Sequence, residues 1–131
     1  MPLASILIVD DDALVRQALR RDLEKLDFVL HLADSPSSAF EILRKERIDI
    51  VISDHAMPGM TGLRFLRLVR DRYPQVVRIM LTGAASLQTA VEAINQDEIY
   101  RFLEKPWDRD ELKFMLLQAC DRMRKGRPSS P

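Results

Sequence analysis

Short apolar runs alternate with helical patterns five times along this chain. Each run is continuously apolar, which is typical of a strand that is buried on both faces of a parallel sheet. The segments between the runs repeat apolar residues every three or four positions, as amphipathic helices do. The pattern predicts an α/β domain with a doubly wound parallel sheet. The expected strands cover residues 6–9, 28–33, 48–53, 76–81 and 99–103.

Capping residues mark several of the helix starts. Asp12 is expected to cap the first helix, and Ser35 is followed by Pro36, a residue favoured at the first helical position. The third helix should end before Pro74, and the fourth should begin near Ser86. These signals place the helix boundaries without any tertiary information.

The last helix has the most distinct start. Asp108 and Glu111 form an Asp-x-x-Glu variant of the capping box, and Trp107 and Leu112 stand at the two positions of a hydrophobic staple. Gly126 is a candidate C-cap for this helix. The helix should therefore begin just after Trp107 and close the domain.

Composition indicates one globular domain. The chain has 131 residues, of which 47% are apolar, and its 20 basic and 20 acidic side chains cancel. This balance favours neither nucleic acid nor an anionic membrane as a direct partner. No apolar stretch is long enough to span a bilayer and the N-terminus has no charged leader, so we expect a cytoplasmic protein. The single cysteine, Cys120, is expected to be a buried small hydrophobe. We expect a domain over residues 1–125 and a linker-like tail over 126–131.

Polar residues with reactive or metal-binding groups follow four of the expected strands. Asp10 and Asp11 follow the first strand, Asp54 the third, Thr82 the fourth and Lys105 the fifth. In an open parallel sheet, ligands bind outside the carboxyl ends of the strands. Three carboxylates, a hydroxyl and an ammonium group are therefore expected to meet at one rim.

This combination suits a hard metal ion and a phosphoryl group. Three clustered carboxylates repel one another unless a cation compensates, and Mg²⁺ accepts carboxylate ligands while leaving room for phosphate oxygens. The Asp54 carboxylate is a candidate nucleophile that would hold the transferred group as an acyl phosphate. Lys105 would neutralise charge on the phosphoryl oxygens, and the Thr82 hydroxyl would donate a hydrogen bond to one of them.

Four segments together resemble the receiver domain of bacterial two-component response regulators. They are Ile-Leu-Ile-Val-Asp-Asp-Asp at 6–12, Val-Ile-Ser-Asp-His-Ala-Met-Pro-Gly-Met-Thr-Gly at 51–62, Leu-Thr-Gly at 81–83 and Lys-Pro at 105–106. The resemblance covers residues from about 4 to 125. It implies a flavodoxin-like sheet of five parallel strands in the order 2-1-3-4-5, with helices on both faces.

The resemblance also implies a role for each rim residue. Asp54 corresponds to the phosphoacceptor, and Asp10 and Asp11 to the acidic pair that holds Mg²⁺, with Asp11 the more direct ligand. The backbone carbonyl of Ala56 would be a further metal ligand. Thr82 would contact the phosphoryl group.

Further expectations come from the resemblance. Lys105 would contact the phosphoryl group, and the bond from Lys105 to Pro106 is usually cis in the family. Phe102 stands at the position of an aromatic switch residue, although an ordinary apolar strand residue fits that position equally well. Apart from Mg²⁺, no cofactor is expected.

The implied function is phosphorelay signalling. A histidine kinase or a histidine phosphotransfer protein would supply the phosphoryl group, and the surface of the fourth helix, fifth strand and fifth helix would then control an output domain or a separate effector. The domain would catalyse only its own phosphotransfer and autodephosphorylation. Residues 93–107 resemble receivers joined to HD-type cyclic-dinucleotide phosphodiesterases or to hybrid histidine kinases. A homodimer is compatible with this function.

Three other interpretations fit the sequence less well. Asp10-x-Asp12 resembles the nucleophile motif of haloacid-dehalogenase-type phosphatases, but Leu14 replaces the Thr or Val of that motif and Asp54 would have no role. A flavin-binding module would need a phosphate loop rich in hydroxyls and glycines where this chain has carboxylates. A degenerate receiver that serves only as a binding platform would not need all five rim residues.

Overall fold

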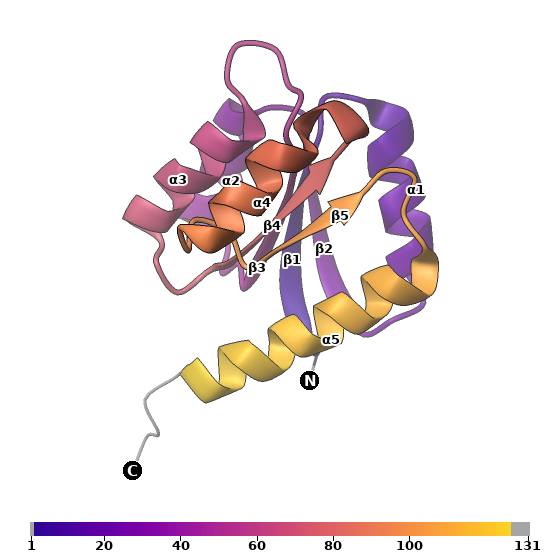
Figure 1. Cartoon of the computed structure of the whole chain (residues 1–131). Helices are drawn as coiled ribbons and strands as arrows, with labels where there is room; N and C mark the ends of the chain where they lie inside the picture. The colour runs from indigo at the N-terminus through magenta and orange to yellow at the C-terminus, as the bar shows by residue number, and fades with distance from the viewer. Residues whose placement is uncertain (1, 127–131) are drawn as a thin grey trace.

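The computed structural model of the chain describes residues 2–126, which form a single five-stranded parallel sheet with helices on both faces (Figure 1). The strand order is β2-β1-β3-β4-β5, which confirms the expected topology. The strands are β1 (Ala4–Val9), β2 (Phe28–Ala33), β3 (Ile50–Asp54), β4 (Val77–Thr82) and β5 (Arg101–Glu104). The helices are α1 (Ala13–Leu23), α2 (Pro36–Lys45), α3 (Gly62–Arg72), α4 (Leu87–Asn95) and α5 (Arg109–Gly126), with a 3-10 turn, η1 (Ala84–Ser86), before α4.

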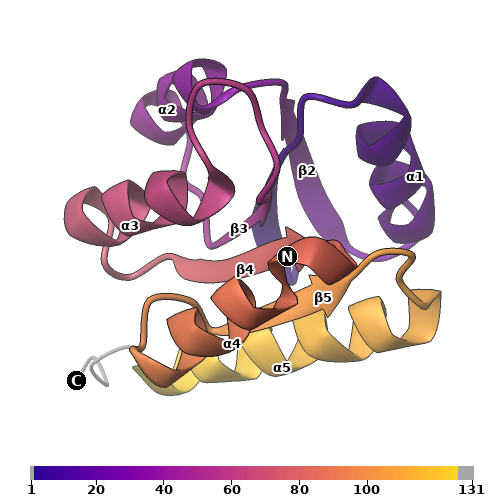
Figure 2. The same ribbon diagram turned by 45° about the horizontal axis from the view of Figure 1, so that its top comes forward.

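Two apolar layers stabilise the sheet, one on each face (Figure 2). Alternate residues of a strand point to opposite faces, so Leu7 and Val9 pack beneath α2, α3 and α4, whereas Ile6 and Ile8 pack beneath α1 and α5. All four of these side chains are fully buried. This two-sided burial explains why the strands read as continuous apolar runs in the sequence.

The strand boundaries differ from the expected ones where apolar residues lie outside the hydrogen-bonded ladder. The expected strand 28–33 is observed unchanged, but the third strand starts at Ile50 instead of residue 48, and the fifth at Arg101 instead of residue 99. Ile48 and Ile99 are nevertheless buried in the layer beneath α2, α3 and α4. In these two strands the apolar run therefore reported burial correctly but placed the start of the ladder two residues too early, whereas β1 begins two residues before its expected start at residue 6.

Three of the expected helix caps are present. Asp12 accepts a hydrogen bond from the N–H of Leu14 (2.9 Å), Ser35 from Ser38 (3.2 Å), and Asp108 from Glu111 (3.0 Å). These bonds satisfy N–H groups that have no partner inside their own helix.

The fourth helix begins at Leu87, directly after Ser86, as expected, but without a side-chain cap. The turn η1 precedes α4, and the Ser86 side chain makes no capping hydrogen bond. The Ser86 N–H donates instead to the carbonyl of Gly83 (3.1 Å), within the turn. Of the five α-helices within residues 2–126, α4 alone begins without a side-chain capping hydrogen bond.

The apolar residues expected around the start of the last helix lie in one layer, and Cys120 is buried as expected. Trp107 is half-buried and packs, like Leu112, in the layer beneath α1 and α5, and Cys120 is buried there as well. Gly126 belongs to α5, and the remainder of the expected tail, residues 127–131, lies outside the described residues. Within residues 2–126, no helix is both long enough and apolar enough to cross a membrane.

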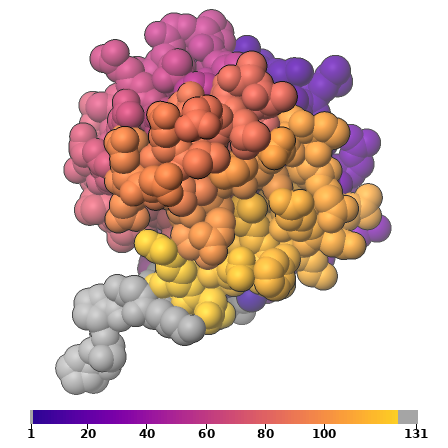
Figure 3. All heavy atoms as spheres, viewed as in Figure 1, coloured from indigo at the N-terminus to yellow at the C-terminus, as the bar shows by residue number. Residues whose placement is uncertain are grey.

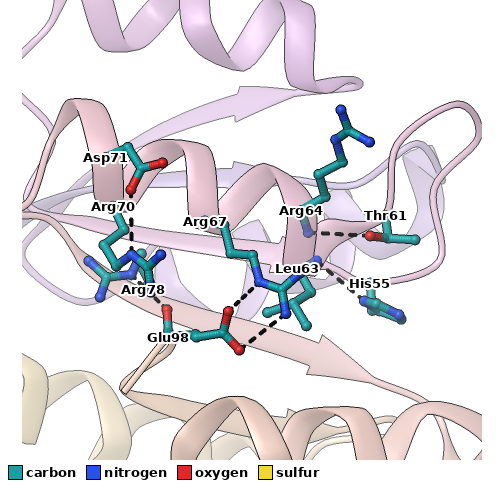
Figure 4. A network of polar contacts seen from close by, with 9 residues as sticks. All are labelled: His55, Thr61, Leu63, Arg64, Arg67, Arg70, Asp71, Arg78 and Glu98. Atoms are coloured by element: carbon teal, nitrogen blue, oxygen red, sulfur yellow. Dashed lines mark hydrogen bonds and ion pairs between the residues drawn. The ribbon is translucent and has the colours of Figure 1, made fainter. Parts of the chain in front are cut away.

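The C-terminal end of α4 is closed by a Schellman motif. The N–H of Glu98 donates to the carbonyl of Ala93 (2.8 Å), and the N–H of Asp97 donates to that of Ile94 (3.0 Å). This geometry places Asp97 in the left-handed region, at φ 60°. The turn is held against α3 and β4, because Arg67 pairs with the Glu98 carboxylate and Arg78 donates to the Glu98 carbonyl (2.9 Å; Figure 4).

Asp97 offers a test of this turn. A residue with a Cβ is strained in the left-handed region and glycine is not, so Asp97→Gly should stabilise the domain by about 0.5–1 kcal/mol. Asp97→Ala removes the carboxylate but keeps the strain, and it should give no such gain. Urea denaturation of the three proteins measures the difference, and equal stabilisation by Ala and Gly would show that charge is the cause.

Candidate functional site

The candidate site lies at the carboxyl edge of the sheet, where the loops join the strands to the helices (Figure 2). Asp10 and Asp11 follow β1, Asp54 is the last residue of β3, Thr82 is the last residue of β4, and Lys105 follows β5. Because β1 pairs with β3, and β3 with β4, these ends meet at one rim. The structure therefore brings the predicted residues together.

Three carboxylates form the acidic part of the site. One oxygen from each of Asp10, Asp11 and Asp54 can be chosen so that all three lie within 4.8 Å of one another. Asp10 is fully buried and Asp54 nearly so, whereas Asp11 is exposed. Oxygen ligands at this spacing could hold a hard divalent cation.

Lys105 supplies the positive charge within the cluster. Its Nζ lies 2.8 Å from Asp54 Oδ1 and 3.7 Å from Asp10 Oδ2, and its backbone N–H donates to the Thr82 carbonyl (2.9 Å). Burial lowers the pKa of Lys105, but the hydrogen bond and charge of Asp54, with those of Asp10, outweigh burial and raise the pKa overall. Lys105 is therefore an ammonium ion at neutral pH.

Asp10 is the least satisfied member of the cluster. Its Oδ1 accepts a hydrogen bond from the Asp12 N–H (2.9 Å), but Oδ2 is the one buried side-chain oxygen or nitrogen in residues 2–126 that has no hydrogen-bond partner. Burial raises the pKa of Asp10 and the Asp54 charge adds to this, although the Asp12 N–H and Lys105 act in the opposite direction. Three carboxylates with one ammonium group leave an excess of negative charge that a divalent cation would balance.

The loop between β3 and α3 holds the Asp54 backbone closely. A Cβ on Gly62 would lie 2.0 Å from the Asp54 carbonyl oxygen, so only glycine fits where α3 begins. The His55 carbonyl accepts hydrogen bonds from the N–H groups of Met57 (3.1 Å) and Gly62 (2.8 Å). His55 Nδ1 accepts another from the Leu63 N–H (3.3 Å), and Figure 4 shows this side chain against the start of α3.

Three other predicted residues have defined surroundings. Ala56 lies in the exposed part of the loop after Asp54, and the metal-binding role of its carbonyl stays a prediction. Thr82 is fully buried, and its hydroxyl donates to the Gly83 carbonyl (3.0 Å). Phe102 is partly buried against the layer beneath α2, α3 and α4. The bond from Lys105 to Pro106 is cis.

The sequence did not reveal a contact made by Trp107, two residues after Lys105. Trp107 Nε1 donates to Asp22 Oδ2 (2.8 Å), and Arg109 Nε lies 3.4 Å from Asp22 Oδ1. Asp22 is far from Trp107 and Arg109 along the chain, and no motif connects it with them. The one sequence signal for this contact was the tryptophan itself, because an indole N–H that becomes buried needs an acceptor.

Comparisons with known proteins agree with the geometry. A family model described as the response regulator receiver domain matches residues 6–117. The hydrogenase transcriptional regulatory protein HoxA of Cupriavidus necator is 34% identical over 118 residues, which are 90% of this chain and 24% of that protein. The C4-dicarboxylate transport transcriptional regulatory protein DctD of Rhizobium meliloti is 37% identical over 120 residues, 92% of this chain and 26% of that protein. This chain thus spans about a quarter of the length of these curated relatives.

A solved structure is similar over nearly the whole domain. It is the signal receiver domain of an HD domain-containing protein from Pseudomonas fluorescens Pf-5, with 38% identity and a TM-score of 0.87. The match covers 93% of this chain and 98% of that one.

Asp10 tests the electrostatic description of the site. Because the pKa of Asp10 is raised in the folded state, its ionisation disfavours folding, and this loss of stability develops as pH rises through that raised pKa. Asp10→Asn cannot ionise, so at neutral pH in EDTA it should be more stable than wild type by about 1 kcal/mol. Thermal unfolding measures this difference.

Added metal should change the order of stability. In millimolar MgCl₂ the wild type should gain stability by binding the cation, whereas Asp10→Asn should gain less. Asp108→Asn, which lies outside the acidic cluster and caps α5, is the matched control and should respond to MgCl₂ as wild type does. An Asp10→Asn protein that is less stable than wild type in EDTA would contradict the description.

Proposed function

We propose that this chain, which belongs to the response regulator receiver domain family, accepts a phosphoryl group on Asp54 in a Mg²⁺-dependent reaction. As a receiver domain it acts in two-component signalling. The observation that supports the proposal most directly is the Lys105 ammonium, 2.8 Å from the nearly buried Asp54 carboxylate and beside two further carboxylates. An ion pair that served only to stabilise the fold would need Asp54 and Lys105, but not Asp10 and Asp11 beside them.

The Asp54 carboxylate would act as the nucleophile. One of its oxygens forms a bond to phosphorus, the bond from phosphorus to the donor breaks, and the electron pair of that bond leaves with the donor. The transferred group carries its negative charge on the equatorial oxygens, and Lys105 is placed to stabilise that charge. The Thr82 hydroxyl can join it only by giving up its hydrogen bond to the Gly83 carbonyl.

The acidic residues fit a magnesium ion. The carboxylates of Asp10, Asp11 and Asp54, with the backbone carbonyl of Ala56, would hold Mg²⁺, which neutralises charge on phosphoryl oxygens when it is bound. The exposed carboxylate of Asp11 would be reached first from solvent, and Asp10 Oδ2, which accepts no hydrogen bond, would gain a metal ion as a close partner.

The phosphoryl donor would be a histidine kinase or a histidine phosphotransfer protein, and the receiver would extend over residues 1–125. The similar proteins support two kinds of output. The HoxA and DctD relatives are transcriptional regulators, and the receiver from Pseudomonas fluorescens belongs to an HD domain-containing protein. In either case the receiver would control a covalent output domain or a separate effector.

Mass spectrometry tests the phosphoacceptor. Incubation with acetyl phosphate and Mg²⁺ should add one phosphoryl group to wild type and none to Asp54→Asn, because the amide is not a nucleophile. EDTA should abolish the labelling of wild type. Equal labelling of the Asn variant would contradict the assignment, and sustained turnover of an aryl phosphate would instead indicate a phosphatase.

Phosphorylation would switch the surface formed by α4, β5 and α5, which faces the viewer in Figure 3. Thr82 would turn towards the phosphoryl group and leave room for the half-buried Phe102 to move inward. Only Gly83 and the turn η1 separate Thr82 from the start of α4, which has no side-chain cap, so this start would be free to move with Thr82. The exposed apolar side chains Val91 of α4, and Phe114 and Leu117 of α5, would then be rearranged for a partner.

NMR spectroscopy tests the switch. Adding beryllofluoride and Mg²⁺ should shift amide resonances from residue 82 to residue 108, because the phosphoryl mimic recruits the Thr82 hydroxyl. Thr82→Ala should keep the shifts near Asp54 but lose most of those in α4. Shifts confined to the metal site in wild type would show that the surface does not respond.

A further inference from the structure

We propose that Asp22 and Trp107 form a positioning pair, which holds the loop between β5 and α5 so that the Lys105 ammonium stays against Asp54. The inference rests on the proposed function, since it concerns the residue that would stabilise phosphoryl charge. Neither Asp22 nor Trp107 reaches the reacting atoms; both would act through Lys105.

The contact is well placed to fix the loop. Trp107 Nε1 donates to Asp22 Oδ2 at 2.8 Å, while its ring packs in the apolar layer beneath α1 and α5. The side chain of Asp22 is only 18% exposed, and its other oxygen lies 3.4 Å from Arg109 Nε. Water competes little for a hydrogen bond at the edge of an apolar layer. This bond therefore constrains the indole more than a hydrogen bond in open solvent would.

The position of Lys105 depends on how both sides of its backbone are held. On the sheet side, the Lys105 N–H donates to the Thr82 carbonyl at 2.9 Å. On the other side, the chain leaves the sheet and passes beside α1 before α5 begins, as Figures 1 and 2 both show. Trp107, two residues after Lys105, is where this segment is tied to α1. A long side chain such as lysine is directed accurately only when its backbone is fixed.

The same helix is tied to the acidic side of the site. Asp12 caps α1, and its N–H donates to Asp10 Oδ1 at 2.9 Å. Arg16 Nη1 donates to the Asp10 carbonyl at 2.6 Å. Helix α1 also carries Asp22 near its C-terminal end. It therefore connects the carboxylates at its N-terminal end to the loop between β5 and α5, which carries Lys105. The Asp22–Trp107 bond therefore sets the ammonium and the carboxylates relative to each other.

Loss of this bond should separate two properties of the site. The carboxylates are held by β1, β3 and the start of α1, so Mg²⁺ affinity should be kept. The Lys105 ammonium would be held from the sheet side alone, so phosphoryl acceptance should slow. A general loss of structure would weaken both properties together, and this difference makes the inference testable.

The experiment compares four variants with wild type in the full chain. Trp107→Phe and Asp22→Ala remove the hydrogen bond; Asp22→Asn keeps an oxygen acceptor for the indole; and Arg109→Gln removes only the ion pair. Calorimetric titration gives the Mg²⁺ affinity, and intact mass gives the rate of labelling by acetyl phosphate at saturating Mg²⁺. Trp107→Phe and Asp22→Ala should label about tenfold more slowly, with Mg²⁺ affinity within about twofold of wild type. Asp22→Asn and Arg109→Gln should label at nearly the wild-type rate.

Tryptophan fluorescence checks the contact itself, because Trp107 is the only tryptophan in the chain. Acrylamide should quench it more strongly in Asp22→Ala than in wild type, Asp22→Asn or Arg109→Gln. Unchanged labelling in both bond-removing variants would overturn the positioning role. A parallel loss of labelling, Mg²⁺ affinity and thermal stability would show a merely structural one. A wild type that takes up no phosphoryl group would overturn the proposed function, and the positioning role with it.

Discussion

The concentration of negative charge at the carboxyl edge of the sheet is the constraint on which the rest of the structure depends. Pairing of β1 with β3 places Asp10 and Asp54 side by side at the end of an apolar sheet, where water cannot fully solvate them. Lys105 offsets part of this charge, and the Asp12 N–H offsets another part. The remaining cost must be balanced by the two apolar layers, each of which includes fully buried strand residues. The burial of these two layers thus supplies the stability that the clustered charges reduce.

The parts of the structure around this charge are held to different degrees. The backbone at Asp54 has almost no freedom, because Gly62 leaves no space for a Cβ and His55 bonds to the start of α3. The far end of α4 is closed by its Schellman motif and by the contacts of Glu98 with Arg67 and Arg78. The near end of α4, next to Thr82, lacks a side-chain cap. A helix fixed at one end and loosely started at the other is suited to pivot when the site changes.

The family membership explains what is shared and leaves the output to the rest of each protein. The two transcriptional regulators and the HD domain-containing protein share this domain with the chain, although their full names describe different activities. The similarity to the solved receiver extends over nearly all of the domain. If the rim accepts a phosphoryl group as we propose, the same rim chemistry can serve different outputs. Output specificity would then depend on surfaces such as α4, β5 and α5, where exposed side chains can change without disturbing the core.

The sequence by itself determined the fold class, the order of elements and the residues at the rim. Continuous apolar runs require strands buried on both faces, and a parallel sheet then brings Asp54 and Lys105 to the same edge whatever the loops do. Caps at Asp12, Ser35 and Asp108 were also readable, because capping is a local interaction between residues close in the chain.

Only the tertiary structure decided the features that join distant segments. These include the bond between Trp107 and Asp22, the pairing of Arg67 with Glu98, and the lack of a hydrogen bond to Asp10 Oδ2. The starts of β3 at Ile50 and of β5 at Arg101 were likewise set by where a neighbouring strand is available to pair. The apolar character of the chain could not show this, because Ile48 and Ile99, which precede these starts, are apolar too. Periodicity records which residues are buried, but a hydrogen bond or ion pair between distant residues depends on how the elements pack against one another, and a single sequence carries no local signal for that.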